Sequence, residues 1–504
     1  MNYLFYDENL VYTDKKNVFY NPDEIYPEYP FKSNISGKAL NSVYAAFRRM
    51  LLDMGLDKVN YGTKDWNPLG KWIKPGQKVL IKPNFVMHRN GSDCPDDLDS
   101  LVTHPSLIRC VLDYCYIALQ GKGKVVVGDA PVKDCDFDLL MERRGYIAIE
   151  RFYKEYSSEF IVEFCDFRGP EEEGGQYKDI GHGVLVNLSE KSWFYNCGHD
   201  ESRYRIPNYD YRKVVSHHTG NKQEYLINSA VLEADVIISL PKPKTHRKNG
   251  YTAALKNFVG INYSKEYLPH HTEGAISAGG DEYITDGFWR KLSSKLRLHI
   301  DINRIRIDRL KKGGNLVKIR MALKLNSLLW RLYGKINAVD QFLSDKKNKS
   351  LSEKAREGTW YGNDTLWRTV LDLNYCLLYA DSNGIVHDGK QRIVLHIGDM
   401  VISGEKEGPM APSPKEQHML LFADNAVVFD CIVTKVMGFD YRKFIGLAKA
   451  VDFSPLNTIH YDDIEINSNI TKFRGKIKSI NFKEIIRPFI AGAGWIGYVE
   501  EYDK

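Results

Sequence analysis

The sequence lacks both the long apolar runs of a membrane protein and the paired cysteines of a disulfide or metal-binding domain. No stretch approaches the roughly 18 consecutive apolar residues that a spanning helix needs. The first residues lack the basic and apolar regions of a secretion signal. Eight cysteines are scattered over 504 residues without a Cys-x-x-Cys pair. We therefore expect no iron–sulfur cluster, zinc knuckle or disulfide framework, and interpret the cysteines as reduced, mostly buried thiols of a cytoplasmic protein.

Several familiar catalytic and nucleotide-binding motifs are missing as well. The chain has no Gly-x-x-x-x-Gly-Lys-Ser/Thr loop, and no Gly-x-Gly-x-x-Gly lies between a predicted strand and a helix. It also has no Gly-x-Ser-x-Gly elbow and no His-Glu-x-x-His pair. These absences disfavour a standard nucleotide, dinucleotide, serine-hydrolase or zinc-protease mechanism.

Basic charge is concentrated in one part of the chain. Residues 291–335 hold 13 Lys or Arg against two acidic residues, Asp301 and Asp308, so this stretch carries +11 while the whole chain carries +5. We interpret it either as a solvated helix pair or as a basic amphipathic helix that contacts an anionic membrane. No nucleic-acid partner is expected, because no recognition motif accompanies the charge.

The hydrophobic pattern predicts an α/β protein with parallel or mixed sheets, flanking helices and two lobes around a cleft. An apolar strand at 79–81, a helix that opens at His104-Pro105 and a strand at 125–127 indicate a parallel crossover unit. Further strands are predicted at 160–164, 236–240, 393–397 and 419–422, and helices at 38–55, 364–380, 427–437 and 442–450.

The chain is too long for one ordinary core, so we divide it into four parts. Residues 1–35 show no clear period and are expected to form an arm over the surface. Residues 36–290 are the first lobe, with an irregular insertion at about 166–230. A basic helical insertion at 291–350 precedes the second lobe at 351–504.

Polar residues follow one predicted strand after another, at the carboxyl ends where parallel α/β sheets bind their ligands. They are Lys82, Asn84, Asp129, Lys242, Lys244, His246, Asp399, Glu405, Glu407, Asp424 and Asp430. One such residue would mean little, since Asp129 alone is typical of a helix cap or a turn. Five strand ends of this kind predict a shared cleft.

The sharpest local signal is the sequence Pro-Lys-Pro-Lys-Thr-His at 241–246. Its prolines favour an extended segment, so Lys242, Lys244 and His246 are expected on one side at a period of two. Two ammonium groups and an imidazole suit a phosphate or a carboxylate. A neutral His246 could instead be a general base, and the plain alternative is an exposed basic loop.

The remaining candidates are assigned by residue type. Lys82, Asn84, Lys244, Lys256 and Asn257 are predicted, with Lys242, to bind an anionic substrate. His246 or His104 would move a proton, and Asp129, Asp399 and Asp430 would orient a metal or a substrate hydroxyl. The adjacent histidines at 217–218 and 270–271 are interpreted as surface residues.

Four carboxylates are expected to face the lysines across the cleft, and two interpretations of them stay open. They could hold a hard divalent cation, or they could balance the lysines. Their spacing matches no standard metal loop. The four are Asp399, Glu405, Asp424 and Asp430.

These motifs together resemble the bacterial and archaeal family called domain of unknown function 362. The resemblance rests on 79–84, His104-Pro105, 127–129 and 234–246, continues through Lys256-Asn257 and Gly260 to 372–374, 398–409 and 424–438, and spans roughly 78–450. The family's activity is generally unsettled. Many members carry ferredoxin-like cysteine clusters, which this chain lacks, and some occur in settings concerned with surface polysaccharides.

We therefore expect an enzyme that acts on a small anionic metabolite or glycan precursor, with its reaction class open. The alternatives are a non-catalytic binding or scaffold protein at the membrane surface, and a metal- or redox-associated protein.

Overall fold

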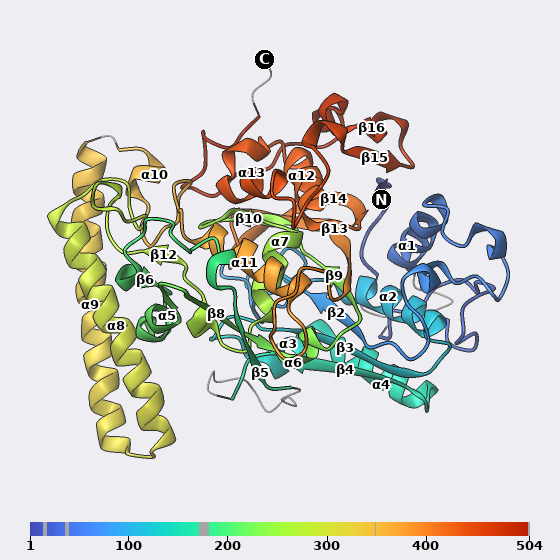
Figure 1. The fold of residues 1–504 in the computed structure, drawn as a ribbon, viewed down its shortest axis with the longest axis horizontal. Coiled ribbons are helices and arrows are strands. Elements are labelled where there is room, and N and C mark those ends of the chain that lie inside the picture. Colours follow the sequence, from blue (N-terminus) through green and yellow to red (C-terminus); the bar gives the residue numbers. More distant parts are fainter. Residues whose placement is uncertain (14–17, 36–39, 171–180, 348, 502–504) are drawn as a thin grey trace.

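The computed structural model describes residues 1–504 except 14–17, 36–39, 171–180, 348 and 502–504 (Figure 1). Its centre is one mixed sheet of 11 strands, in which nine follow the order β16-β15-β1-β14-β13-β9-β2-β3-β4. The other two, β10 (Lys244–His246) and β11 (Gly250–Thr252), branch off this path. Helices flank this sheet. The predicted α/β class with parallel and antiparallel strands is confirmed.

The parallel half of the sheet contains the strands that the apolar runs predicted. They are β2 (Val79–Pro83), β3 (Gly123–Asp129), β4 (Phe160–Asp166), β9 (Val236–Leu240) and the first part of β13 (Ile393–Glu407). Ile81 packs on one face of the sheet with α2, and Leu80 packs on the other face with α11. Because both faces are covered, these strands are apolar throughout rather than alternating.

The antiparallel half begins at β13, whose long second part pairs with β14 (Ala411–Ala423). Beyond β14 lie β1 (Asn2–Tyr6), β15 (Glu465–Ser468) and β16 (Gly475–Lys476). The start of the expected surface arm is thus a strand inside the sheet, paired with β14 on one side and β15 on the other. Five residues are too few to show a period, and β1 is held by its two neighbours rather than by its own pattern.

Helices cover both faces of the sheet. The predicted helices are present at slightly different bounds, and the predicted start at Lys38 lies outside the described residues. The helices are α1 (Ser42–Asp53), α2 (Pro105–Ala118), α3 (Phe137–Arg144), α4 (Tyr146–Tyr156), α5 (Tyr211–His217), α6 (Ser229–Leu232), α7 (Ala254–Asn257), α8 (Phe288–Lys312), α9 (Leu316–Lys346), α10 (Leu351–Lys354), α11 (Leu366–Tyr379), α12 (Ala426–Val436) and α13 (Ile445–Val451).

The two predicted insertions have different structures. The segment expected to be irregular contributes β5 (Gly183–Asn187), β7 (His218–Thr219) and β8 (Lys222–Asn228) to a three-stranded sheet, and β6 (Tyr204–Arg205) pairs with β12 (His271–Thr272). The basic insertion is a helical hairpin, with α8 and α9 side by side at the left edge of Figure 1. Within the described residues, no helix has both the length and the apolar character needed to cross a membrane.

Strands from both predicted lobes join in the one large sheet. β9 of the first lobe pairs in parallel with β13 of the second, with Val236 opposite Ile393. The polar ends of the two strands therefore lie at the same edge. The division of the chain into two lobes stays a prediction.

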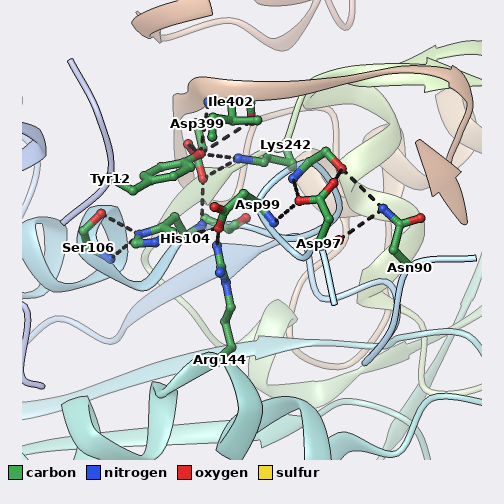
Figure 2. A network of polar contacts seen from close by, with 12 residues as sticks. Tyr12, Asn90, Asp97, Asp99, His104, Ser106, Arg144, Lys242, Asp399 and Ile402 are labelled. Carbon is green, nitrogen blue, oxygen red and sulfur yellow. Dashed lines mark hydrogen bonds and ion pairs between the residues drawn. The ribbon is translucent and has the colours of Figure 1, made fainter. Parts of the chain in front are cut away.

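A buried ion pair connects this edge to the N-terminal segment. Lys242 Nζ lies 3.0 Å from Asp399 Oδ2, and neither side chain is exposed. The Tyr12 hydroxyl donates to Asp399 Oδ1 at 2.6 Å, and the His104 backbone N–H donates to Oδ2 at 2.7 Å. Figure 2 shows these groups converging on the carboxylate. Asp399 lies on β13 and thus holds three other parts of the chain to this strand: the N-terminal segment, the start of α2 and the segment that follows β9.

Replacement of Lys242 by Met should destabilise the protein strongly. The variant leaves the Asp399 carboxylate buried without its cation, and breaking such a pair costs about 3–5 kcal/mol. The free energy of unfolding in urea measures the loss. Lys64→Met is the matched control, because it removes an ion pair whose side chains are 81% and 68% exposed and should change stability little. Equal losses in the two variants would contradict the role assigned to the buried pair.

Candidate functional site

A cavity of about 290 Å³ lies at the carboxyl ends of the parallel strands. Six of the predicted site residues line it: Asn84, Asp129, Lys244, His246, Lys256 and Asn257. They come from the segments after β2, β3 and β9 and from α7. These segments meet because parallel strands that run side by side end at one edge of the sheet. The expected shared cleft therefore contains about half of the predicted residues.

Lys82 and Asp129 form the ion pair beneath the cavity. Lys82 Nζ lies 2.7 Å from Asp129 Oδ1 and also donates to the Pro83 carbonyl oxygen at 2.8 Å. Asp129 Oδ2 accepts the Phe85 N–H at 2.6 Å. Gly260 packs so closely that a Cβ there would lie 1.7 Å from Asp129 Oδ1. Both charged groups are engaged, which favours a structural role over direct substrate contact.

Lys244 is fully buried, and its ammonium has no carboxylate partner among the residues that the structure describes. Nζ donates to Asn84 Oδ1 at 2.9 Å and to the Leu101 carbonyl oxygen. Asn84 Nδ2 in turn donates to Asn257 Oδ1 at 3.4 Å, and Asn257 Nδ2 donates to the Lys82 carbonyl oxygen at 2.9 Å. Burial, followed by the charges of Lys242 and Lys256, holds the pKa of Lys244 well below its usual value. Amide oxygens orient this cation without neutralising it.

Further lysines make the same wall more positive. Lys256 Nζ has no hydrogen-bond or ion-pair partner among the described residues. Burial and then the charges of Lys265 and Lys248 lower its pKa to about 7. Lys248 donates to the backbone oxygen of Glu357, and burial lowers its pKa to about 8. The cavity therefore gathers cations that repel one another.

The two histidines of the cavity have opposite tautomers, as assigned from their hydrogen bonds. His246 Nδ1 accepts the N–H groups of Lys248 and Asn249 at 3.0 Å each, so the neutral ring carries its proton on Nε2. His270 Nδ1 lies 2.8 Å from the Leu268 carbonyl oxygen and must donate to it, which leaves Nε2 with a lone pair. His246 is thus suited to donate a hydrogen bond rather than to act as a base, and His270 is suited to accept one.

Both histidines are neutral in the empty cavity. Burial, and then the charges of Lys256 and Arg247, hold the pKa of His246 well below its usual value. Burial lowers the pKa of His270 to about 3, against the hydrogen bond to Leu268 and with help from Lys248 and Lys256. The lysines that would attract an anion also keep the imidazoles uncharged.

Besides Lys82, which lies beneath the cavity, two predicted catalytic or substrate-binding residues do not line it. His104 caps α2, where its Nδ1 accepts the Ser106 N–H at 3.1 Å, and its ring stacks on Tyr12 with the ring centres 3.8 Å apart. Lys242 pairs with Asp399 instead of pointing the same way as Lys244 and His246. The period of two holds only from Lys244, where β10 (Lys244–His246) begins. Both residues support the site without facing it.

The four predicted metal ligands do not come together. Asp399 pairs with Lys242, and Glu405, six residues further along β13 and so about 20 Å away, accepts the Ile490 N–H at 3.0 Å. Asp430 lies within α12 and accepts the Ala254 N–H at 2.7 Å, at the start of α7. In the part of the chain that the structure describes, no group of three His, Cys, Asp or Glu side chains could hold a metal ion.

Asp424 lies at the opposite edge of the sheet. It follows β14, which runs antiparallel to β13, so its carboxyl end meets the amino ends of the parallel strands. There it binds the N-terminal ammonium at 2.7 Å and borders a separate hollow of about 520 Å³. The strand was predicted correctly, but its direction cannot be deduced from its own residues.

The cavity is also lined by residues that sequence reasoning did not assign to the site, among them Lys248, Lys265 and His270, and the interpretation of His270 as a surface residue is wrong. Lys248 continues the period of two that starts at Lys244 and could have been found by extending it. Lys265 and His270 come from the irregular segment after α7, where no strand or helix pattern indicates a direction. Only the packing of that segment over the cavity brings them to the site.

Comparisons with known proteins add a family and one distant relative. The chain is similar to the Thylakoid-associated protein sll1697 of Synechocystis sp., with 23% identity over 212 residues. That match covers 42% of this chain and 47% of the relative, so it spans about half of the relative's length. No solved structure matches the chain.

The family comparison covers most of the sequence, including the cavity. A family model matches residues 79–173 and 193–435. These ranges contain the lysines that line the cavity and the ion pairs Lys82–Asp129 and Lys242–Asp399. The resemblance that the motifs indicated is confirmed. Because the match extends over well more than half of the chain, this protein belongs to the family described as domain of unknown function (DUF362).

Proposed function

We propose that this protein is an enzyme that acts on a small organic anion, a phosphorylated or carboxylated metabolite or glycan precursor, bound in the 290 Å³ cavity. One observation carries the proposal: Lys244, Lys248 and Lys256 line the cavity, and within the described residues none of them pairs with a carboxylate. Buried charges are costly unless they are paired. A bound anion supplies the missing negative charge.

The rest of the wall supports an organic ligand rather than a bare inorganic ion. Apolar side chains stand beside the lysines, and the volume is at the lower end of the range for small-molecule sites. These apolar residues include Val86, Met87, Ile206 and Val259. An anionic group on the lysines would leave the carbon skeleton against this apolar surface.

The two histidines of the cavity, His246 and His270, support chemistry in addition to binding. His246 would donate from Nε2–H to an oxygen of the substrate, while His270 Nε2 would accept a proton. A bound anion opposes the positive field of the lysines and so raises the pKa of His270 from about 3 toward the range of a useful base.

Lys256 should contribute strongly to anion binding. In a panel of sugar phosphates and carboxylated metabolites screened by thermal shift and calorimetry, at least one compound should bind. Lys256→Met should weaken its binding about 10- to 100-fold, because a hydrogen bond to a charged group contributes about 1.5–3 kcal/mol. Lys122→Met, at an exposed ion pair, is the control. Equal affinity in both variants, or no ligand in the panel, would contradict the proposal.

Anion binding should take up protons and weaken as the pH rises. Lys256 and Lys248 have pKa values of about 7 and about 8 in the empty cavity, and a bound anion raises both. Between pH 7 and 9 the complex therefore holds more protons than the free protein. The second ionisation of a phosphate monoester, near pH ~6, lies below this window.

Calorimetry at pH 8 in two buffers of different ionisation enthalpy measures the proton count directly. Proton release, or an affinity that is constant from pH 7 to 9, would contradict this assignment of the lysines.

A specific feature of α9 favours a second function, attachment to an anionic membrane surface. Apolar side chains recur at spacings of three, four or seven and so share one face of the helix. All are exposed, by 38% to 69%: Val317, Met321, Leu325, Leu328, Leu332, Val339 and Leu343. A different face of α9, which includes the buried Ala322, packs on α8. We call these seven residues the apolar stripe.

Basic residues accompany the apolar stripe. Arg320, Lys324, Arg331 and Lys335 recur at spacings of four and seven, so they form a row along its edge. Lysine and arginine stems can lie along an apolar surface while their charges reach lipid headgroups. The name of the Synechocystis relative, thylakoid-associated protein, agrees with this proposal. A second copy of the helix would bring like charges together, which disfavours self-association.

Vesicle sedimentation tests the stripe. The protein should pellet with phosphatidylglycerol vesicles at low salt and much less with phosphatidylcholine vesicles. Leu328→Glu/Leu332→Glu should reduce pelleting about tenfold or more, since two charges must enter the interface. Leu323→Glu is the control, because Leu323 is 47% exposed on α9 but outside the stripe. Equal effects of the two substitutions, or equal pelleting with both lipids, would reject the attachment.

A further inference from the structure

A cysteine, a histidine and an aspartate stand in a row outside the cavity. His199 Nε2 lies 2.8 Å from Asp364 Oδ2. The same carboxylate accepts Trp367 Nε1 at 2.9 Å and Arg368 Nη2 at 2.8 Å. Asp364 is therefore held from three directions, and it fixes the plane of the imidazole.

The other side of the imidazole faces Cys197. The ring interacts with the Cys197 thiol, and because Nε2 is taken by Asp364, Nδ1 is the nitrogen left for the sulfur. Nδ1 is buried and makes no hydrogen bond of ordinary geometry among the described residues. Nδ1 is therefore open to accept the proton of the thiol. A nucleophile, a base and an orienting carboxylate follow one another in the order of a thiol triad.

Gly198 separates the cysteine from the histidine and sets the turn between them. Its φ of +85° is in the left-handed region, which other residues adopt only with strain. A Cβ at this position would meet nothing within 4 Å, so the conformation and not the space calls for glycine. The local sequence therefore determines how Cys197 and His199 are placed relative to each other.

The surrounding groups favour the charged form of both partners. Partial burial opposes ionisation of Cys197, but the hydrogen bond and charge of His199, helped by the Tyr204 hydroxyl 3.6 Å from Sγ, lower its pKa. Burial also opposes protonation of His199, yet Asp364 and then Cys197 raise its pKa to about 9. Arg368, the other charge that faces the imidazole, works against this. These surroundings therefore favour ionisation of the thiol and protonation of the imidazole.

Cys197 differs in this respect from five of the buried cysteines. Burial raises the pKa of Cys110, Cys115, Cys135, Cys376 and Cys431. Cys94 is exposed, and Cys197 is partly exposed. Cys197 thus combines partial exposure with a lowered pKa, and exposure and pKa together govern thiol reactivity.

We propose that Cys197 is a reactive thiolate site that hydroperoxides and other soft electrophiles modify, with His199 as its acid–base partner and Asp364 as the residue that positions His199. With a hydroperoxide, the sulfur attacks the terminal oxygen, an S–O bond forms and the O–O bond breaks. The sulfur is oxidised to a sulfenic acid, and the peroxide is reduced to an alkoxide that takes the proton of the imidazolium.

Site-resolved alkylation tests the proposal on the intact protein. With iodoacetamide at pH 6.5, peptide mass spectrometry should find Cys197 modified at least ten times faster than the exposed Cys94. After brief exposure to hydrogen peroxide, dimedone should label Cys197 and leave Cys94 unlabelled. Equal or faster reaction of Cys94 would overturn the proposal.

Two variants separate the triad from plain accessibility. His199→Gln, whose amide can still donate to Asp364, should slow alkylation of Cys197 at least tenfold and move its pH–rate profile upward to that of an ordinary thiol. Asp364→Asn should give a smaller shift in the same direction. Unchanged Cys94 rates and continued protection of the buried cysteines show that the variants are folded. A Cys197 profile unaffected by His199→Gln in such a folded protein would overturn the proposal.

Discussion

Two lysines at neighbouring strand ends are buried completely, and each is neutralised by an aspartate from the next strand. Lys82 ends β2 and pairs with Asp129 of β3, while Lys242 follows β9 and pairs with Asp399 of β13. Removing such charges from water costs several kcal/mol per ion, so a lysine and its aspartate must stay together once the protein is folded. The pairs hold the carboxyl edge of the sheet in one arrangement, on which the cavity is built.

The cavity differs from these ion pairs, because its Lys244 and Lys256 are not balanced by carboxylates in the described part of the chain. Lys244 is oriented by amide and carbonyl oxygens, and Lys256 has no polar partner among the described residues. The aspartates are committed to Lys82 and Lys242, and Asp134 at the cavity wall pairs with Arg304. In the described part of the chain neither of these two cavity lysines therefore has a carboxylate partner, and burial lowers the pKa of both. The same edge of the sheet thus carries paired lysines that stabilise the fold and unpaired lysines that favour an anionic ligand.

The inserted segments are tied to this centre through a few polar contacts. Lys248 of the cavity donates to the backbone of Glu357. The Glu357 carboxylate forms an ion pair with Arg297 of α8 at 3.0 Å and accepts the Tyr333 hydroxyl of α9 at 3.3 Å. His199 bonds to Asp364, which lies just before α11. Ser192 and Tyr225 donate to Asp372 in the middle of α11. The helical hairpin and the thiol site are therefore anchored to the same core, although neither lines the cavity.

The sequence by itself determined the α/β class, the main strands and helices, the family, and six of the residues that line the cavity. These follow from local properties: apolar runs, glycine and proline positions, and polar residues directly after strands. The tertiary structure alone decided which charges are paired, so Lys82 and Lys242 became part of the scaffold while Lys244 and Lys256 faced the cavity. It also set the direction of β14, which moved Asp424 to the far edge, and the place of His270. Strand direction and ion pairing depend on residues distant in the chain, and no local pattern records them.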